Sequence, residues 1–367
     1  MARPADPPPA PAERARLTLR DVAARAGVSR ATVSLVLRDS PLVAAETRER
    51  VRAAVDALGY TYNRGAAMLR ASRTQTIGLV VTDITNPFFG EMAVGVDNAM
   101  DPAGYVSFLV STGEDLERQE RFLRRMREQG VDGVVLCPAA GTPPELIRRL
   151  RDWQLPCVQA LRHVSTSAAE TGDDHAAADN RFGLEQVVEH LIRLGHRRIA
   201  YIGGDLSHSV SRARRSGFTA AMRRHGLDTG LMLKAPVSRR AGAEAIGALL
   251  DGPAPPTAVV CFNDVVAFGA MLGLERRGLR AGRDIAVTGV DDLPEAALRE
   301  PGLTTVSTLP RLVGEEAGRL LLRRIAEPDR PPEQVILPAR LVVRASCGAA
   351  RGGAETSAGM ALTETVP

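Results

Sequence analysis

Two short stretches of the sequence place polar side chains directly behind apolar runs that have the pattern of buried β-strands. Asp83, Asn86, Phe88 and Phe89 follow one such run, and Asp264 follows another. Amides and carboxylates exchange hydrogen bonds with hydroxyl groups, and aromatic rings offer flat apolar faces. Side chains of these kinds at strand ends are typical of a binding site for a small polar molecule.

Structural roles compete with this interpretation. Phe88 and Phe89 can both belong to a core; we expect one of them there and assign Phe88 to the ligand site. Asp264 can cap a helix beside its strand end, and it can do so while also accepting two hydrogen bonds from a vicinal diol. For each residue the two roles stay open at this point.

The segments that position these residues alternate between strand-like and helical patterns from Thr76 onward, which indicates parallel, doubly wound sheets. Ligands bind such sheets at the carboxyl ends of the strands. About 270 residues is large for one core, so two lobes are expected. The predicted strands are Ile77–Thr82, Tyr105–Val110, Gly133–Cys137, Ile199–Gly203, Ala258–Phe262 and Ile285–Val290. The predicted helices are Phe88–Met100, Leu116–Gln129, Arg181–Leu194, Arg212–His225, Arg239–Leu250 and Val265–Arg277.

Signatures of common enzymes are missing from this part of the sequence. It contains no Walker loop, zinc-protease motif, nucleophile elbow or dinucleotide-binding glycine pattern. Asp173, Asp174 and His175 could form a metal site, but three adjacent residues rarely converge on one ion. We therefore expect a loop there, no metal, no cofactor and no catalysis.

An all-helical pattern precedes the strands. Thr18 and Asp21 have the spacing of a capping box, Gly27 ends the first predicted helix and Ser29 caps the second, which runs to Arg38. A third helix is predicted near residues 46–58. Three short helices within about 45 residues can share one small core.

The stretch from Asp21 to Ser34 has helix-turn-helix spacing. Ser29, Thr32 and Ser34 can reach phosphates, and Arg30 can reach a guanine edge in the major groove. Such spacing also occurs by chance in helical proteins. Residues 1–73 carry 13 arginines against 7 acidic residues, a net +6, whereas the whole chain has a net charge of +4. This basic excess favours a polyanionic partner, although a solvated charged face is the usual explanation for a charge run.

The sequence from Thr18 to Val81 resembles the N-terminal signature of the LacI/GalR family of transcriptional regulators, and the similarity continues to about Ser346. The resemblance implies that Arg30, Ala31 and Leu35 read bases, with Leu35 making methyl contacts. It also implies that Leu69 enters the minor groove as an apolar wedge. The remaining members of the predicted DNA-binding set are Thr18, Asn63 and Arg70. Ala44 departs from the family pattern, since a serine cap is usual at the start of the third helix.

The same resemblance extends the ligand site. It implies that Arg214, in the family's R-x-x-G-F pattern, points into a cleft between the lobes, where its fork can bind two hydroxyls or one carboxylate. Asp291 belongs to a stretch similar to the family's crossover between the lobes, with a helix cap as the alternative. Leu161 stands where the family usually has aspartate. The loop near Val237 lacks an aromatic residue for stacking a base, which favours a sugar or polyol over a nucleobase.

The predicted fold is an α/β body of two doubly wound lobes, like the periplasmic binding proteins, with a small all-α helix-turn-helix domain in front. The predicted parts are a disordered leader at 1–16, the DNA-binding domain at 17–62, a hinge helix and linker at 63–75, the two-lobed body at 76–348 and a flexible tail at 349–367.

The predicted function is a repressor that binds a palindromic operator in double-stranded DNA as a homodimer and is controlled by a small-molecule effector. A two-fold dimer is needed to bind a palindrome, and the tail lacks the leucine heptads of helical tetramers. Four separated cysteines, no secretory signal and no run of about 18 apolar residues favour the cytoplasm and no membrane contact.

Two other classes of protein were considered from the residues. A solute-binding protein of the transport class would have a similar body, but the missing secretion signal and the basic helical module argue against it. An α/β enzyme with an added helical domain is the other alternative, and no nucleophile–base pair in the sequence supports it.

Overall fold

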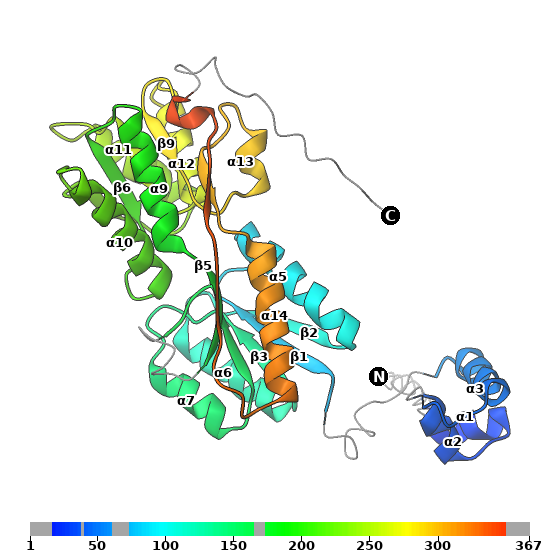
Figure 1. The fold of residues 1–367 in the computed structure, drawn as a ribbon. Helices are drawn as coiled ribbons and strands as arrows, with labels where there is room; N and C mark the ends of the chain where they lie inside the picture. The colour runs from blue at the N-terminus through cyan, green and yellow to red at the C-terminus, as the bar shows by residue number, and fades with distance from the viewer. Residues whose placement is uncertain (1–16, 38–39, 61–72, 165–172, 350–367) are drawn as a thin grey trace, which may run out of the picture. The chain divides into compact units, whose positions relative to one another are not determined.

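The computed structural model describes residues 17–37, 40–60, 73–164 and 173–349. The chain divides into two compact units between Thr74 and Gln75 (Figure 1). The predicted leader, most of the predicted hinge and nearly all of the predicted tail lie outside the described residues.

The first unit holds three helices around a small apolar core. Helices α1 (Leu19–Ala26) and α2 (Arg30–Val36) are joined through Gly27, whose φ of 65° lies in the left-handed region that favours glycine. Helix α3 (Ala45–Leu58) packs against both of them. The buried side chains of this core are Val22, Ala23, Ala26, Val33, Val36, Val51, Ala54 and Tyr60.

Side-chain caps fix the ends of these helices as the sequence predicts. Thr18 and Asp21 form a capping box: Asp21 Oδ2 accepts from the Thr18 backbone N at 2.7 Å, and the Thr18 side chain accepts from the start of the helix. Ser29 Oγ accepts from the Thr32 backbone N at 3.1 Å and caps α2. The N-cap residue of α3 is Ala44, which supplies no side-chain cap, as its identity implies.

The second unit is an α/β structure with two parallel sheets, and these define its two lobes (Figure 1). The first lobe has a six-stranded sheet in the order β11-β5-β4-β3-β1-β2, and the second lobe has a four-stranded sheet in the order β7-β6-β8-β9. The first sheet contains β1 (Thr76–Val81), β2 (Val106–Ser111), β3 (Gly133–Leu136), β4 (Cys157–Ala160), β5 (Asp174–Ala178) and β11 (Gln334–Leu337). The second contains β6 (Ile199–Gly203), β7 (Met232–Lys234), β8 (Ala258–Cys261) and β9 (Ala286–Thr288).

Helices cover both faces of each sheet, because successive side chains of a strand point to opposite faces. Ile77, Leu79 and Val81 of β1 pack into one cluster with α5 and α14, whereas Val80 packs into another with α6 and α7. The helices of the first lobe are α5 (Pro87–Met100), α6 (Leu116–Glu128), α7 (Pro144–Asp152) and α14 (Pro310–Ala326), with the short η1 (Asp101–Ala103) after α5. Those of the second lobe are α9 (Asn180–Arg193), α10 (Ser209–Arg224), α11 (Arg239–Leu250), α12 (Asp264–Glu275) and α13 (Pro294–Leu298), with the short η2 (Ala345–Cys347) near its end.

Helices α5 and α14 approach each other closely enough to require glycine, and Figure 1 shows them side by side. A Cβ atom on Gly95 would lie 1.9 Å from the carbonyl oxygen of Arg311, and one on Gly314 would lie 2.0 Å from that of Met92. Contacts this short are impossible for any other residue. The glycines therefore fix a helix pair whose members lie more than 200 residues apart in the sequence.

The chain passes between the lobes from β5 to α9, from β10 (Thr305–Ser307) to α14, and from β11 to β12 (Arg340–Val342). β10 and β12 pair antiparallel beside these crossings. The second lobe thus returns into the first before the chain ends, so α14 and β11 belong to the first lobe although they follow the second in sequence.

The two predicted lobes are confirmed, and β6 and α11 have the predicted bounds. Helix α10 begins at Ser209, three residues before the predicted start. The strands β4, β5, β7, β10, β11 and β12 and the helices α7, α13 and α14 were not predicted.

The predicted loop at residues 173–175 is wrong, because Asp174 and His175 begin β5. Asp174 is fully buried and is neutralised by Arg324 of α14, whose Nε lies 2.9 Å from Asp174 Oδ2. A partner 150 residues away leaves no local signal in the sequence. Among the described residues, no group of three or more His, Cys, Asp or Glu side chains is placed to hold a metal ion.

Candidate functional site

Helix α2 turns its apolar side chains into the core of the first unit and its remaining side chains outward. Val33 and Val36 are buried, whereas Arg30 and Ala31 are exposed and Leu35 is partly exposed. A short helix with such a face can enter the major groove with its first residues against base edges. The positions that the resemblance assigns to base recognition thus lie on the accessible side of α2.

Hydroxyl groups gather at the start of the same helix. Ser29 and Thr18 are exposed, and Thr32 and Ser34 are partly exposed. Ser29 Oγ lies 2.9 Å from Thr32 Oγ1, so these two hydroxyls orient each other as well as capping the helix. Their contact with phosphates stays a prediction.

Three members of the predicted DNA-binding set, Asn63, Leu69 and Arg70, lie outside the described residues. The wedge role that the resemblance gives to Leu69 therefore stays a prediction.

A cavity of about 600 Å³ lies between the lobes of the second unit. Its lining follows the carboxyl ends of parallel strands in both sheets, which is where doubly wound folds bind ligands. The first lobe contributes Asp83, Asn86, Phe88, Phe89, Glu114 and Arg162 among others. The second lobe contributes Asp205, His208, Arg214, Lys234, Asn263 and Asp291, together with the Phe262 ring.

Arg214, on α10, is held in a fixed orientation at this cavity and is only 2% exposed. Its Nε donates to Asn180 Oδ1 at 2.7 Å, and its Nη1 donates to the Phe262 carbonyl oxygen at 2.7 Å. Its Nη2 donates to Asp291 Oδ1 at 2.9 Å. The guanidinium carbon also lies 4.8 Å from the centre of the Phe262 ring. A guanidinium anchored in this way keeps two N–H groups for other acceptors.

Asp291 occupies a strained backbone position beside Arg214. Its φ is 116°, a value that L-residues rarely adopt, and its backbone N donates to the Val306 carbonyl at 2.8 Å. Burial raises the pKa of Asp291, and the Arg214 guanidinium limits that rise. The structure therefore places two separately predicted site residues, Arg214 and Asp291, together on the cavity wall.

Arg162 is the corresponding buried cation of the first lobe. Its Nη1 and Nη2 lie 3.0 and 2.8 Å from the two carboxylate oxygens of Glu114, a fork-to-fork contact. Glu114 Oε2 also accepts from the Ala140 backbone N at 2.8 Å. The predicted loss of a carboxylate at Leu161 is thus partly offset, because Glu114 brings a carboxylate to the same wall from the loop before α6.

The lobes touch beside the cavity. The His163 backbone N, which follows β4 of the first lobe, donates to Ser209 Oγ at the start of α10 at 3.0 Å. His208, which caps α10, also lines the cavity, and burial together with Arg162 and Arg214 lowers its pKa to about 3. His208 is therefore a neutral ring at ordinary pH.

The three predicted residues of the first lobe lie together on the wall. Phe88 and Phe89 are 2% and 5% exposed, and their rings meet edge to face at 5.5 Å. Both line the cavity and both belong to the core, so the predicted division between them is wrong. Asn86 lines the cavity and caps α5, accepting from the Phe88 backbone N at 3.1 Å.

Asp264 is the predicted site residue that the structure places away from the cavity lining. It is fully buried, its Oδ2 accepts from the Leu293 backbone N at 2.8 Å, and its Oδ1 accepts from Thr305 Oγ1 at 2.5 Å. The cap of α12 is the preceding residue, Asn263, which also lines the cavity. Because its oxygens bind the crossover segment, Asp264 fits neither of the two roles weighed from the sequence.

Several lining residues were missed in the sequence. Glu114 and Asp205 stand in loops after strands that were themselves predicted, β2 and β6, and Lys234 ends the short strand β7. Lys234 could have been singled out from the sequence, because it is the only lysine among the 47 basic residues of the chain.

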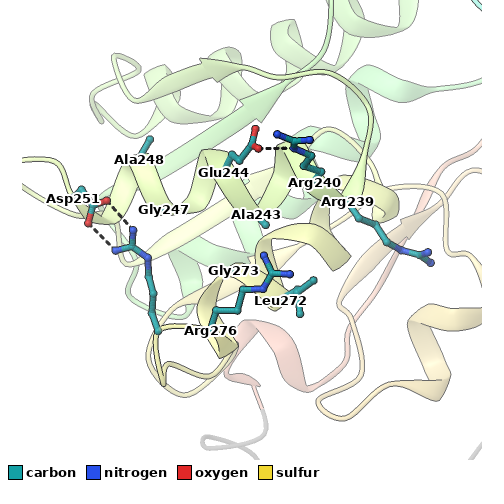
Figure 2. Close-up of a pocket in the computed structure, with 11 residues that line it drawn as sticks. Arg239, Arg240, Ala243, Glu244, Gly247, Ala248, Asp251, Leu272, Gly273 and Arg276 are labelled. Atoms are coloured by element: carbon teal, nitrogen blue, oxygen red, sulfur yellow. Dashed lines mark hydrogen bonds and ion pairs between the residues drawn. The ribbon is translucent and has the colours of Figure 1, made fainter.

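A second hollow, of about 780 Å³, lies on the helices of the second lobe (Figure 2). It is lined by side chains of α11, α12 and the residues that follow them, and Figure 2 shows Arg240 joined to Glu244 along α11. Its charged side chains are exposed, and two pairs of them, Arg240 with Glu244 and Arg277 with Asp251, form ion pairs on the same surface. We do not assign it to the ligand site, since it lacks contributions from strand ends and from the first lobe.

A helix-turn-helix unit joined to a two-lobed α/β unit with a cavity between its lobes defines a class of ligand-responsive DNA-binding regulators. Residues 18–63 match the family described as bacterial regulatory proteins, lacI family. Residues 74–345 match the periplasmic binding proteins and sugar binding domain of the LacI family. The chain therefore belongs to the LacI family of DNA-binding transcriptional regulators.

Individual relatives align with this chain over almost its whole length. The maltose regulon regulatory protein MalI of Escherichia coli K12 is 35% identical, with 89% of this chain and 98% of the relative covered. The ribose operon repressor of the same organism is 34% identical, with coverage of 90% and 99%. Among solved structures, a lac repressor dimer bound to operator and an anti-inducer has a TM-score of 0.80 at 28% identity, covering 91% and 99%. A complex of the regulator CelR with cellobiose has a TM-score of 0.69 at 32% identity, covering 90% and 100%.

Each helix in the described part of the chain is too short or too polar to cross a bilayer.

Proposed function

We propose that this protein represses transcription by binding a palindromic operator as a homodimer, and that a sugar or another polyol in the cavity controls this binding. The observation that carries the proposal is the pairing, in one chain, of an exposed recognition helix with a polar cavity between two lobes. The two sites then share one equilibrium, so that effector and operator affect each other's affinity reciprocally.

The proposed DNA contacts begin with Arg30. It is exposed at the first position of α2, and no described residue forms an ion pair with it. An arginine there can donate two hydrogen bonds to a guanine edge. Thr18, Ser29, Thr32 and Ser34 bind phosphates in this proposal, and Ala31 and Leu35 contact bases through their apolar groups.

The proposed effector contacts are the cavity-lining residues Asn86, Phe88, Phe89, Arg214 and Asp291. Polar groups that both donate and accept, set among aromatic rings, suit a ring with several hydroxyls. Relatives point the same way, since one is named a ribose operon repressor and another was solved with cellobiose. Asp264, which the sequence placed in this set, acts here through the crossover segment it holds.

Self-association is proposed at the free edge of the first sheet. β2 is the last strand of that sheet, and its Val106 and Phe108 are 56% and 52% exposed. Val94 of the neighbouring α5 is 43% exposed. Exposed apolar side chains on an open sheet edge mark a contact surface.

A DNA-binding regulator acts in the compartment that holds its DNA, so we place this protein in the cytoplasm.

The test is selection of an operator from fragmented genomic DNA, followed by footprinting of the full-length protein. We expect a palindromic site protected by a dimer. Arg30→Ala should cost about 1–3 kcal/mol per contact and relax base preference at one symmetric pair of positions. Arg25→Ala, at an exposed arginine in the last turn of α1, is the matched control. A protein that prefers no duplex over random competitor at moderate salt would contradict the proposal.

A further inference from the structure

Each described cation on the cavity wall already has its own carboxylate. The three described lining residues with a permanent positive charge come from both lobes, and each forms an ion pair with another lining residue. The pairs are Arg162 Nη2 with Glu114 Oε1 at 2.8 Å, Arg214 Nη2 with Asp291 Oδ1 at 2.9 Å, and Lys234 Nζ with Asp205 Oδ2 at 3.0 Å.

The two arginines also donate hydrogen bonds to uncharged acceptors. Arg162 Nη1 donates to the Pro138 carbonyl at 3.2 Å, and Arg214 donates to Asn180 and to the carbonyl of Phe262. Both side chains are less than 10% exposed. Arg214 cannot turn its fork to a new anion without leaving the buried carboxylate of Asp291 uncompensated, which is costly. Arg162 would have to give up its two-point contact with Glu114, whose side chain is 40% exposed.

The wall also carries one carboxylate beyond these pairs. Asp83 lines the cavity and accepts from the Thr85 backbone N at 2.9 Å and from Thr85 Oγ1 at 2.6 Å, but no described residue forms an ion pair with it. The remaining ionisable ring, His208, is neutral for the reasons given above. The described lining therefore has one more negative than positive charge.

Such a wall discriminates by ligand charge. A phosphate or carboxylate on a ligand would lose its hydration and meet a surplus of negative charge, so its burial would be uncompensated. Hydroxyl groups suit the same wall, because carboxylate oxygens accept from them and the unused N–H groups of Arg214 donate to them. Phe88, Phe89 and Phe262 supply the apolar faces against which the C–H groups of a sugar ring can pack.

We propose that the cavity selects an uncharged saccharide over its phosphorylated form, and that the Lys234–Asp205 pair sets this selection. This inference rests on the proposed function. The pair is the most accessible of the three, with side chains 70% and 51% exposed, so an incoming phosphate could reach Lys234 without entering the buried part of the cavity. Asp205 opposes that approach, and the backbone N of Ser207 holds it in place by donating to Asp205 Oδ1 at 2.9 Å.

The experiment compares ribose, maltose and cellobiose with their monophosphates, using the full-length protein. Two readouts are measured for each probe: the shift in Tm, and the rate at which an acylating reagent modifies Lys234. Because Lys234 is the only lysine of the sequence, its acylation is followed without interference from another side-chain amine. We expect at least one neutral sugar to raise Tm and to slow acylation of Lys234, while its phosphate does neither.

Asp205→Asn tests the selection itself. Removing this charge should improve the affinity of the phosphorylated form relative to the neutral one by up to about fivefold at low salt, the order of one screened charge interaction. Asp251→Asn is the matched control, since Asp251 is an exposed, ion-paired aspartate of the same lobe that lies outside the cavity (Figure 2). It should leave the ratio unchanged.

Several outcomes would overturn the proposal. They are tighter binding of a phosphorylated sugar by the unaltered protein, stabilisation by a neutral sugar without protection of Lys234, an Asp205→Asn variant with the original ratio, and no binding of any sugar in the set. Operator binding, measured separately without any sugar, shows whether the repressor function stands independently of the ligand class.

Discussion

Arg214 and Arg277 make the same kind of contact in two different surroundings. Arg214 binds one oxygen of Asp291 in the cavity wall, where the two side chains are 3% and 4% exposed. Arg277 binds both oxygens of Asp251 at 2.6 and 2.7 Å in the helix-surface hollow of Figure 2, where the side chains are 41% and 64% exposed. By contact geometry alone, the surface pair is the better ion pair.

The difference shows that surroundings, rather than contact geometry, make a binding site. Water and salt screen the surface pair, so the charges of Arg277 and Asp251 are weakly felt beyond their own contact. The cavity pair lies in a medium of low polarity, where its field persists and where each charge has lost its hydration. Asn180 and the carbonyl of Phe262 hold Arg214 in place, whereas among the described residues the Arg277 side chain donates hydrogen bonds to Asp251 alone.

Removing Arg214 should have the largest effect. Arg214→Ala leaves Asp291 buried without a counter-charge, so the free energy of unfolding should fall by about 3–5 kcal/mol. Urea denaturation measures this loss, and calorimetry with a saccharide that binds the unaltered protein should show no binding by the variant. Arg214→Lys keeps the charge but loses the fork, so it should recover part of the stability and little of the binding. A loss no larger than that caused by Arg277→Ala would contradict the comparison.

Asp264 is a buried carboxylate that forms no ion pair with a described residue, so the pH dependence of its contribution to stability should differ from that of both ion pairs. Burial raises the pKa of Asp264 well above its ordinary value of 3.8. Because its pKa is higher in the folded protein than in the unfolded chain, the stability it contributes is complete below the unfolded value and is lost as the pH rises through the folded value. Asp264→Asn cannot ionise, so the Tm of this variant relative to the unaltered protein should be higher at about pH 8 than at about pH 5.

Asp264→Ala is the companion variant. It leaves Thr305 Oγ1 and the Leu293 backbone N without their acceptor, at about 1–3 kcal/mol for each buried group. Thermal unfolding across the pH range separates the two variants. An asparagine variant as unstable as the alanine variant, with the pH dependence of the unaltered protein, would show that Asp264 is ionised in the fold.

The first unit was largely predictable because its determinants are local. Thr18, Gly27 and Ser29 act on residues no more than a few positions away, and each forms the cap or turn expected from its type. The body was predictable at the level of alternating strands and helices. Two of its unpredicted elements share one cause: β5 and α14 are stabilised by partners far along the chain, as the ion pair of Asp174 with Arg324 illustrates.

The cavity was only half predictable for a related reason. Asn86 and Phe88 follow a strand with a clear apolar pattern, so their place at its end could be inferred. Glu114 lies in the loop after β2, a strand without a buried side chain, and Lys234 is the last residue of β7, which is only three residues long. Asn263 and Asp264 are adjacent, and the first turn of α12 decides which of them lines the cavity. Composition and spacing do not reveal which of two adjacent residues faces the cavity.

The smallest effect is expected at the helix surface. Hydrogen bonds from Arg277 lower the pKa of Asp251, so the pair contributes what stability it has above the unfolded value of Asp251 and loses it as the pH falls. Both groups stay hydrated, and Arg277→Ala should therefore leave the urea midpoint unchanged at physiological salt. Any small change seen at low salt should disappear when salt is added, whereas the loss caused by Arg214→Ala should persist. If the stability lost on Arg277→Ala did not decrease when salt was added, the hollow around Arg277 would be a preorganised site like the cavity. The difference between the two would then lie in ligand access instead of burial.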